Sequence, residues 1–251
     1  MVASPGAADA VRRARAMPSL RVGLHIVLVE ATPALPPERI PDLVARDGHF
    51  RTDMARLGLE IALRPSVRRQ IAAEITAQFE AFAATGLPLD HVNAHKHFHL
   101  HPAIGAALIA IGQRFGARAI RVPTEPVGVV RAIEPTSAGL SSSLLAQWTR
   151  ILRAQARRAG MMAPDAVFGL SWSGAMTRER VKGLLTRLPS GVIEIYTHPA
   201  TANAFAGHAP GYRYTDELAA LTDPDAIAAV RGSGHRLGGF GDGVRWDASP
   251  V

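Results

Sequence analysis

The chain has 251 residues, 47% hydrophobic and 20% charged, a composition typical of a soluble globular protein with a sizeable core. The net charge of +7 is spread over scattered arginines with no run of five basic residues, which argues against a nucleic-acid binder but leaves weak attraction to anionic membranes open. There are no cysteines, so disulfides and thiolate ligands are excluded, and any metal must be held by His, Asp or Glu. No apolar stretch reaches the roughly 18 residues of a membrane span, and residues 1–21 lack a signal-peptide core, so we expect a cytoplasmic protein.

The first half of the chain alternates between helical and strand patterns. We predict a helix over 7–17, a strand over 21–30, a loop over 31–63, a helix over 65–85, a strand over 89–94, a helix over 102–115 and a strand over 117–122. The strand over 21–30 is apolar almost throughout, as in a strand buried on both faces of a parallel sheet. The loop follows from four prolines and a glycine between Pro33 and Gly48, and such long loops are often functional.

The second half continues the alternation. We predict a loop over 127–141, a helix over 142–159, a strand over 166–172, a helix over 177–188, a strand over 191–196, a loop over 201–211, helices over 215–221 and 225–231, a strand over 237–240 and a frayed tail over 243–251. Strand–helix alternation predicts an α/β fold with a parallel sheet, in a single domain over 1–251. A TIM-like barrel would bring the C-terminal ends of the strands to one mouth.

A histidine-rich segment over 90–102 is the strongest functional signal. It holds five of the ten histidines, all at odd positions. An extended strand would therefore place one group of side chains on one face: His91, Asn93, His95, His97, His99 and His101. Imidazole is a common metal ligand and titrates near neutral pH, so the pattern favours a divalent-metal site or acid–base chemistry. A His-rich surface tract and buried structural histidines remain the alternatives, and one ion could reach only two or three of these side chains.

Other polar residues follow the predicted strands. They are His25 in the strand over 21–30, Arg121 and Glu125 after the strand over 117–122, Trp172 after that over 166–172, and His198 after that over 191–196. Because sites in parallel α/β folds lie at the C-terminal ends of strands, these residues are candidates for a single active site.

The motifs in this order resemble the YdjC/ChbG family of carbohydrate deacetylases, above all its hopanoid-biosynthesis-associated branch. The matching segments are Gly23-Leu24-His25, the stretch from His91 to His99, Arg121-Val122-Pro123 and the stretch from Glu194 to Pro199, with Tyr212-Arg213, Glu217-Leu218 and 236–238 further on. The resemblance covers residues 7–242. It implies a modified TIM-like barrel of the YdjC type.

The resemblance also implies a reaction and a set of site residues. The reaction is metal-dependent hydrolysis of an N-acetyl group from an amino sugar, with an N-acetylglucosaminyl hopanoid lipid as the substrate of that branch. His25 and His95 are the implied ligands of a divalent ion, magnesium first and zinc second. His198 and Arg213 are the implied pocket residues. We expect His198 to protonate the leaving amine, and Arg121, Glu125, Trp172 and Arg213 to bind the sugar.

Two departures from the family pattern bear on activity. Family members begin with a strand ending in an Ala-Asp-Asp-Phe-Gly-like motif, whose aspartates supply a metal ligand and a general base, and this motif is absent here. We therefore expect the barrel to lack its first strand and helix, with His97 as a partial substitute ligand or catalytic group. The family also often has Asp where Asn93 stands. The alternative hypothesis is a truncated, inactive homologue that binds a sugar or lipid. A homodimer and peripheral membrane contact remain open.

Overall fold

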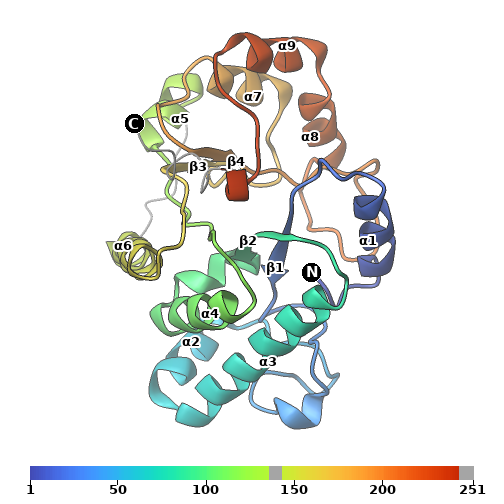
Figure 1. Cartoon of the computed structure of the whole chain (residues 1–251), viewed down its shortest axis with the longest axis vertical. Coiled ribbons are helices and arrows are strands. Elements are labelled where there is room, and N and C mark those ends of the chain that lie inside the picture. The colour runs from blue at the N-terminus through green and yellow to red at the C-terminus, as the bar shows by residue number, and fades with distance from the viewer. Residues whose placement is uncertain (136–142, 243–251) are drawn as a thin grey trace. The chain divides into compact units, whose positions relative to one another are not determined.

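The computed structural model describes residues 1–135 and 143–242, which divide into two compact units (Figure 1). Unit 1 comprises residues 1–122, 145–163 and those from 238, and unit 2 comprises residues 123–144 and 164–237, in each case where described. Each unit has its own core of buried hydrophobic side chains. The expectation of a single domain stays a prediction, and the predicted tail over 243–251 lies outside the described residues.

Unit 1 is built around a short parallel sheet. Its elements are α1 (Ala7–Arg15), β1 (Val22–Ile26), a 3-10 helix η1 (Pro37–Arg39), α2 (Met54–Leu63), α3 (Pro65–Ala83), β2 (Leu89–Ala94), a 3-10 helix η2 (His95–Leu100), α4 (Pro102–Arg114) and most of α6 (Ser143–Arg158). β1 pairs with β2 in parallel, with His25 opposite Asn93. Single parallel bridges continue the sheet from Val92 to Ile120 and from Ala119 to Met162. The strand predicted over 117–122 is thus reduced to isolated bridges, while the strand over 89–94 is confirmed with the predicted bounds.

The helix predicted over 65–85 is confirmed as α3, which packs against α4 (Figure 1). Its apolar stripe of Ile71, Ile75, Phe79 and Phe82 is buried in the core of unit 1, as the three- and four-residue spacing requires. The chain leaves the helix through Gly86, whose φ of 70° is favourable only for a residue without a Cβ. The helix lies under β1, because Gln78 donates to the carbonyl of Val27 and accepts from its amide.

The prediction of a structureless loop over 31–63 is wrong in its second half. Residues 54–63 form α2, whose first turn is capped by Asp53 accepting from the amide of Arg56 at 2.9 Å. Leu57 and Ile61, one turn apart, face the core and are buried. Prolines and a glycine dominate the first part of the segment, and they end before this helix begins.

Unit 2 contains a second parallel pair of strands. Its elements are α5 (Val127–Ile133), β3 (Ala166–Phe168), α7 (Arg178–Leu185), β4 (Ile193–Ile195), α8 (Tyr214–Leu221) and α9 (Pro224–Gly232). Val167 lies opposite Glu194, and the amide of Val167 also donates to the carbonyl of Thr124. The loop predicted over 127–141 is wrong up to Ile133, where α5 forms, and its residues 136–141 lie outside the described part.

The strand predicted over 237–240 is also wrong. In unit 1, the amides of Phe240 and Gly241 donate to the carboxylate of Asp90 at 3.0 and 2.9 Å, and residues 240–242 form a helical turn. A Cβ on Gly239 would lie 2.3 Å from a side-chain carbon of Arg21, so this close approach requires glycine. Because these amides donate to Asp90, they cannot form the hydrogen bonds of a β-strand.

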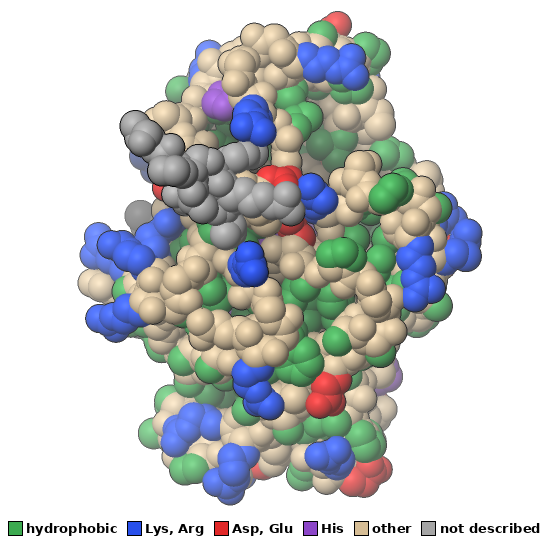
Figure 2. Space-filling view, in the orientation of Figure 1, with side chains coloured by type: hydrophobic (Ala, Val, Ile, Leu, Met, Phe, Trp, Pro, Cys, Tyr) green, Lys and Arg blue, Asp and Glu red, His purple; other side chains and the backbone are tan. Residues whose placement is uncertain are grey.

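The α/β class with parallel strands is confirmed, whereas the closed barrel stays a prediction. Within residues 1–135 and 143–242 the paired strands form two two-stranded sheets, and neither closes on itself. In the same residues, no helix combines the length and the hydrophobicity that crossing a membrane needs. Lys and Arg side chains are dispersed over the face drawn in Figure 2, in line with the scattered charge of the sequence.

Candidate active site

The register of β1 and β2 brings His25 and Asn93 together. Nδ1 of His25 lies 2.5 Å from Oδ1 of Asn93, so the imidazole donates from Nδ1 and keeps its lone pair on Nε2. Burial lowers the pKa of His25 to about 3, although the Asn93 hydrogen bond opposes this shift. His25 is therefore a neutral imidazole at neutral pH, in the form in which it can bind a cation.

His95 begins η2 directly after β2 and completes a pair with His25. The two rings meet edge to face, with centroids 5.8 Å apart and an interplanar angle of 76°. Nε2 of His95 lies 3.6 Å from Oε2 of Glu30. Burial lowers the pKa of His95 in spite of this carboxylate, which would raise it. Both imidazoles thus have one ring nitrogen directed toward an oxygen acceptor, an arrangement that commonly orients metal-binding histidines.

Left-handed backbone lies next to His95. The described residues other than glycine have a positive φ at three places: Glu30 at 66°, Lys96 at 50° and His97 at 54°. Glu30 and Lys96 belong to one cluster with His95, since the ammonium of Lys96 forms an ion pair with Glu30, which contacts His95. Non-glycine residues in this conformation are uncommon and gather at functional sites. Glu30 was missed by the sequence reading, although its position just after the strand over 21–30 was a usable signal.

The predicted one-sided row of imidazoles is wrong beyond Ala94. The turn into η2 replaces the extended backbone, and the left-handed residues Lys96 and His97 break the alternation of side chains. His99 is buried and its Nε2 donates to the carbonyl of Arg121 at 2.8 Å, which gives it a core role. His101 packs edge-on against Trp148, with ring centroids 5.3 Å apart. His97 is half-buried beside His99, at a centroid distance of 6.2 Å.

The metal hypothesis can be tested against these donors. His25 and His95 are neutral and adjacent, and so suit two positions around a divalent ion. Among the described residues, however, no group of three or more His, Asp or Glu side chains is placed to hold one ion. Catalytic zinc commonly has three protein ligands, whereas magnesium prefers oxygen donors. The pair therefore fits as two nitrogen ligands, and nitrogen donors favour a transition ion such as zinc over magnesium.

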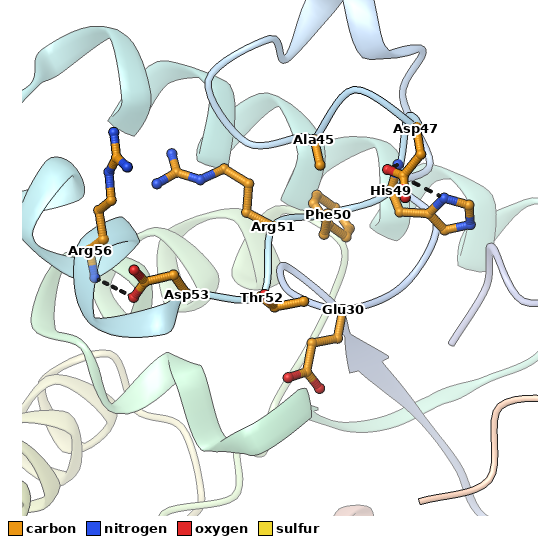
Figure 3. Close-up of a pocket in the computed structure, with 9 residues that line it drawn as sticks. All are labelled: Glu30, Ala45, Asp47, His49, Phe50, Arg51, Thr52, Asp53 and Arg56. Atoms are coloured by element: carbon orange, nitrogen blue, oxygen red, sulfur yellow. Dashed lines mark hydrogen bonds and ion pairs between the residues drawn. The ribbon is translucent and has the colours of Figure 1, made fainter.

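A pocket of about 520 Å³ adjoins the histidine pair through Glu30 (Figure 3). Charged and polar side chains between β1 and α2 dominate its lining: Glu30, Ala45, Asp47, His49, Phe50, Arg51, Thr52, Asp53 and Arg56. Its volume lies in the range that small ligands occupy.

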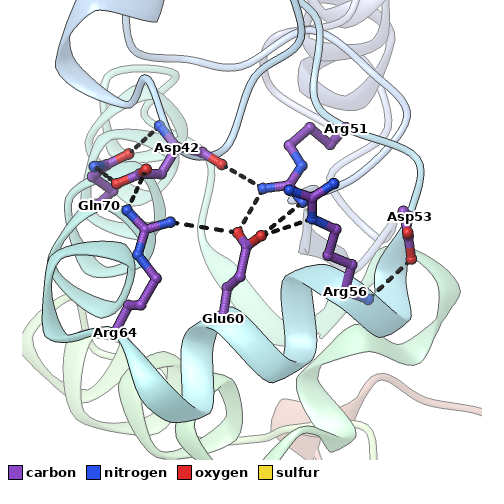
Figure 4. A network of polar contacts seen from close by, with 7 residues as sticks. All are labelled: Asp42, Arg51, Asp53, Arg56, Glu60, Arg64 and Gln70. Carbon is purple, nitrogen blue, oxygen red and sulfur yellow. Dashed lines mark hydrogen bonds and ion pairs between the residues drawn. The ribbon is translucent and has the colours of Figure 1, made fainter.

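The two arginines of the pocket are already engaged in a network (Figure 4). Arg51 donates to Glu60 at 2.7 Å and to the carbonyl of Asp42 at 2.9 Å, and Arg56 donates to Glu60 at 3.0 Å. Arg64 and Gln70 donate to the carboxylate of Asp42 at 2.8 and 2.7 Å. The network ties the 42–53 segment to α2 and α3, and so supports the backbone beside Glu30 rather than presenting an unbalanced positive charge.

In unit 2, His198 follows β4 and lies within a group of aromatic rings. Its ring centroid is 5.6 Å from that of Tyr196 and 5.0 Å from that of Tyr212. The buried carboxylate of Glu217 accepts the backbone N–H of His198 and, at 3.0 Å, that of Met176. Nδ1 of His198 lies 3.9 Å from Oε2 of the same carboxylate. His198 is thus half-exposed, on a backbone fixed by a buried negative group.

The other predicted site residues have different surroundings. Glu125 accepts the amides of residues 169–171 at 2.8 to 2.9 Å, so its carboxylate already closes the turn after β3. Trp172 is only 4% exposed in the core of unit 2, with the guanidinium of Arg180 5.3 Å from its ring centroid, which leaves little of its face for a sugar. Arg213 is exposed and donates to Asp216 at 2.5 Å.

Arg121 lies in unit 1, where it is 9% exposed and continues the sheet through its amide, which donates to Val92. His25, His95, His97 and Arg121 therefore belong to unit 1, whereas Glu125, Trp172, His198 and Arg213 belong to unit 2. The structure brings together His25 with His95, and His198 with Tyr212 and Glu217. The roles assigned to all of these residues stay predictions.

The comparisons with known proteins agree with this architecture of parallel strands that carry imidazoles at their ends. The chain belongs to the family described as YdjC-like protein, whose model matches residues 1–231. It is 28% identical over 241 residues to a carbohydrate deacetylase of Geobacillus stearothermophilus, covering 94% of this chain and 82% of the relative. It is 27% identical over 236 residues to a chitooligosaccharide deacetylase of Yersinia enterocolitica, covering 90% and 79%.

A solved structure has the same fold. The crystal structure of a putative cellobiose-phosphate cleavage protein from Enterococcus faecalis superposes with a TM-score of 0.70 at 21% identity, covering 96% of this chain and 85% of that one. At this identity the likeness shows the fold alone.

Proposed function

We propose that this protein is a carbohydrate deacetylase that hydrolyses the N-acetyl group of an amino sugar. The neutral pair His25 and His95, oriented by Asn93 and Glu30 at the end of two parallel strands, is the observation that carries the proposal. Relatives over nine-tenths of the chain are named carbohydrate and chitooligosaccharide deacetylases, which supports the same reaction here.

The reaction adds water to an amide. The water oxygen forms a bond to the acetyl carbon, the C–N bond breaks, acetate leaves, and the departing amine takes up a proton. His25 and His95 would hold a divalent ion, which when bound would lower the pKa of a water molecule and polarise the acetyl carbonyl. His198 would donate the proton to the amine through its half-exposed imidazole. Glu217 would keep the backbone of His198 in place.

The narrower substrate that we propose is an N-acetylglucosaminyl lipid of the hopanoid type, and the proposed ion is zinc or magnesium. The proposed substrate rests on the sequence resemblance to the hopanoid-associated branch. The proposed ion is supported by two neutral imidazoles that lie side by side, with ring centroids 5.8 Å apart. The nitrogen donors lead us to expect stronger activation by zinc than by magnesium.

Acetate release from N,N′-diacetylchitobiose tests the proposal. The full chain is assayed after chelation and again after addition of zinc, manganese or magnesium. We expect chelation to abolish release, one of the ions to restore it, and His25→Ala or His95→Ala to lower kcat/KM at least about 100-fold. His235→Ala is the matched control, because His235 is exposed in unit 2.

Binding separates the enzyme from its alternative. Calorimetry with the same disaccharide shows whether the wild-type chain binds the sugar. Binding without acetate release under any ion would reject the deacetylase and support a sugar-binding homologue. Release that survives both chelation and His25→Ala would reject the metal-dependent reaction.

A further inference from the structure

Two helices of unit 1 expose large apolar side chains to solvent. On α2, Leu59 and Leu63 lie one turn apart and are 61% and 70% exposed. On α6, Leu145 and Ile151 are 41% and 39% exposed. A single exposed apolar side chain is normal, whereas a contiguous group of them marks an interaction surface. The question is therefore whether these side chains lie on the same surface.

His101, between η2 and α4, joins α2 to α6. A Cβ on Gly58 in α2 would lie 3.6 Å from Cδ2 of His101. On its other side, the ring of His101 meets that of Trp148 in α6 edge-on, with centroids 5.3 Å apart. The two helices thus flank one imidazole (Figure 1). We call the surface on both sides of His101 the α2–α6 face, and its members are Leu59, next to Gly58, Leu63, Leu145, Trp148, Arg150, Ile151 and Arg157.

The charged side chains of α4 and α6 are all basic. These two helices carry five arginines and no aspartate or glutamate: Arg114, Arg150, Arg153, Arg157 and Arg158. Figure 2 shows Lys and Arg side chains at its left edge, where Figure 1 labels α6. The carboxylate of α2, Glu60, accepts hydrogen bonds from Arg51 and Arg56. A basic amphipathic helix at the surface of a protein is typical of binding to anionic membranes.

We propose that the α2–α6 face binds the surface of an anionic lipid membrane. Its leucines and isoleucine would leave water for the boundary between headgroups and acyl chains, which is favourable for apolar surface. The arginines would lie near lipid phosphates, and each basic side chain there adds to the attraction. Trp148 is half-buried beside them, and tryptophan is enriched at membrane interfaces.

The two other classes of partner fit this face less well. A second copy of the chain would bring arginine-rich helices together, and like charges across an interface are unfavourable. A nucleic acid would satisfy the arginines, but its phosphates would offer no apolar partner to Leu59 and Leu63. A membrane offers both chemistries on one surface.

The face adjoins elements that build the candidate site. η2 leads from His95 of the histidine pair to His101, and Arg56 of α2 lines the pocket of about 520 Å³. A chain bound through this face would hold these elements near the lipid headgroups. The delivery of a glycolipid to the site rests on the proposed function, whereas binding to the membrane does not.

Co-sedimentation of the full chain with vesicles tests the α2–α6 face. Vesicles of phosphatidylcholine are compared with vesicles of phosphatidylcholine and phosphatidylglycerol in equal parts. We expect binding to the mixed vesicles that weakens as salt is added, and binding at least about tenfold weaker to phosphatidylcholine alone. Leu59→Ser combined with Leu63→Ser should weaken binding to the mixed vesicles about tenfold, and Arg150→Gln about fivefold.

Leu221→Ser and Arg231→Gln are the matched controls, because both side chains are exposed in unit 2. Both controls should bind the vesicles like wild type. Circular dichroism shows that each variant is folded. The variants of the face should also release acetate from N,N′-diacetylchitobiose like wild type, since a soluble sugar needs no membrane.

The opposite results would overturn the proposal. They are a wild type that does not bind the mixed vesicles, binding that the substitutions on the face do not weaken, and equal losses in the two controls. Binding to a DNA duplex that Arg150→Gln weakens, with no effect of the leucine substitutions on vesicles, would assign the face to nucleic acid. If the vesicles bind as expected but no acetate is released from the disaccharide, the proposed reaction fails while the membrane surface holds.

Discussion

Two imidazole–carboxylate pairs, one in each unit, are built in different ways. In unit 1 the carboxylate of Glu30 lies 3.6 Å from His95, is 30% exposed, and is balanced by the ammonium of Lys96. In unit 2 the carboxylate of Glu217 lies 3.9 Å from His198, is fully buried, and is balanced by two backbone amides. The two imidazole–carboxylate distances are thus similar, whereas the burial and the partners of the two carboxylates differ.

The difference in burial predicts a different main role for each carboxylate: one orients a histidine side chain, and the other stabilises the fold. A buried carboxylate that accepts backbone amides cannot be removed without leaving buried donors unsatisfied. A partly exposed carboxylate that forms an ion pair with a lysine can be replaced with little loss of stability, because water solvates both charges. Glu217 should therefore matter first for the stability of unit 2, and Glu30 first for the chemistry of His95.

The largest effect is expected for Glu217→Ala. The substitution leaves the amides of Met176 and His198 without their acceptor inside the protein and should lower the free energy of unfolding by about 3 kcal/mol. Urea denaturation followed by circular dichroism measures it. Glu217→Gln keeps one acceptor oxygen for one of the two amides and should lose less, about 2 kcal/mol, because its NH2 group cannot accept from the other amide. Unchanged stability of the alanine variant would remove the contrast between the two pairs.

Local patterns predicted the elements near the site better than the site itself. The strand over 89–94 and the helix over 65–85 were predictable because their apolar spacing matches the faces they bury. The choice of His25 and His95 followed from the resemblance, and the structure brings these side chains together through the parallel register. Their surroundings were not predictable, since the contact of Glu30 with His95 depends on atoms 65 residues apart in the chain.

The failures have physical causes. Alternating histidines look the same whether the backbone stays extended or turns left-handed at Lys96 and His97, because the alternation describes side chains and not φ. The surroundings of Trp172 were also not predictable, since Arg180 and the core of unit 2 cover most of its ring, and its role in sugar binding stays a prediction.

Glu30→Gln tests the expected role of the partly exposed carboxylate in unit 1. The free energy of unfolding should change by less than about 0.5 kcal/mol, because the side chain is partly exposed. The affinity of the metal-free protein for zinc should fall about 10- to 100-fold, as when a group that orients a histidine ligand is lost. Calorimetry measures the affinity, and nitrogen-15 NMR of the metal-free protein shows which ring nitrogen of His95 carries the proton.

Lys96→Met provides the matched control for Glu30→Gln. It removes the cation and keeps the carboxylate, so the affinity for zinc should change less than in the glutamine variant. If Glu30→Gln left both the affinity and the protonated nitrogen of His95 as in wild type, Glu30 would have no positioning role.

The smallest effect concerns Glu60, a carboxylate balanced by arginines instead of an imidazole. Hydrogen bonds from Arg51 lower the pKa of Glu60 from 4.5 to about 2, against the effect of burial. A lowered carboxyl pKa adds stability that is fully present above about pH 4.5 and is lost as the pH falls toward 2. We expect a loss of about 1 to 2 kcal/mol over this range, less than the pKa shift alone implies, because the network is partly solvated. Urea denaturation at several pH values measures the loss, and Glu60→Gln should reduce its dependence on pH. If Glu60→Gln lost stability as steeply at low pH as wild type, the pH dependence of the unfolding free energy would come from other carboxylates, and the arginine network would make no measurable contribution to it.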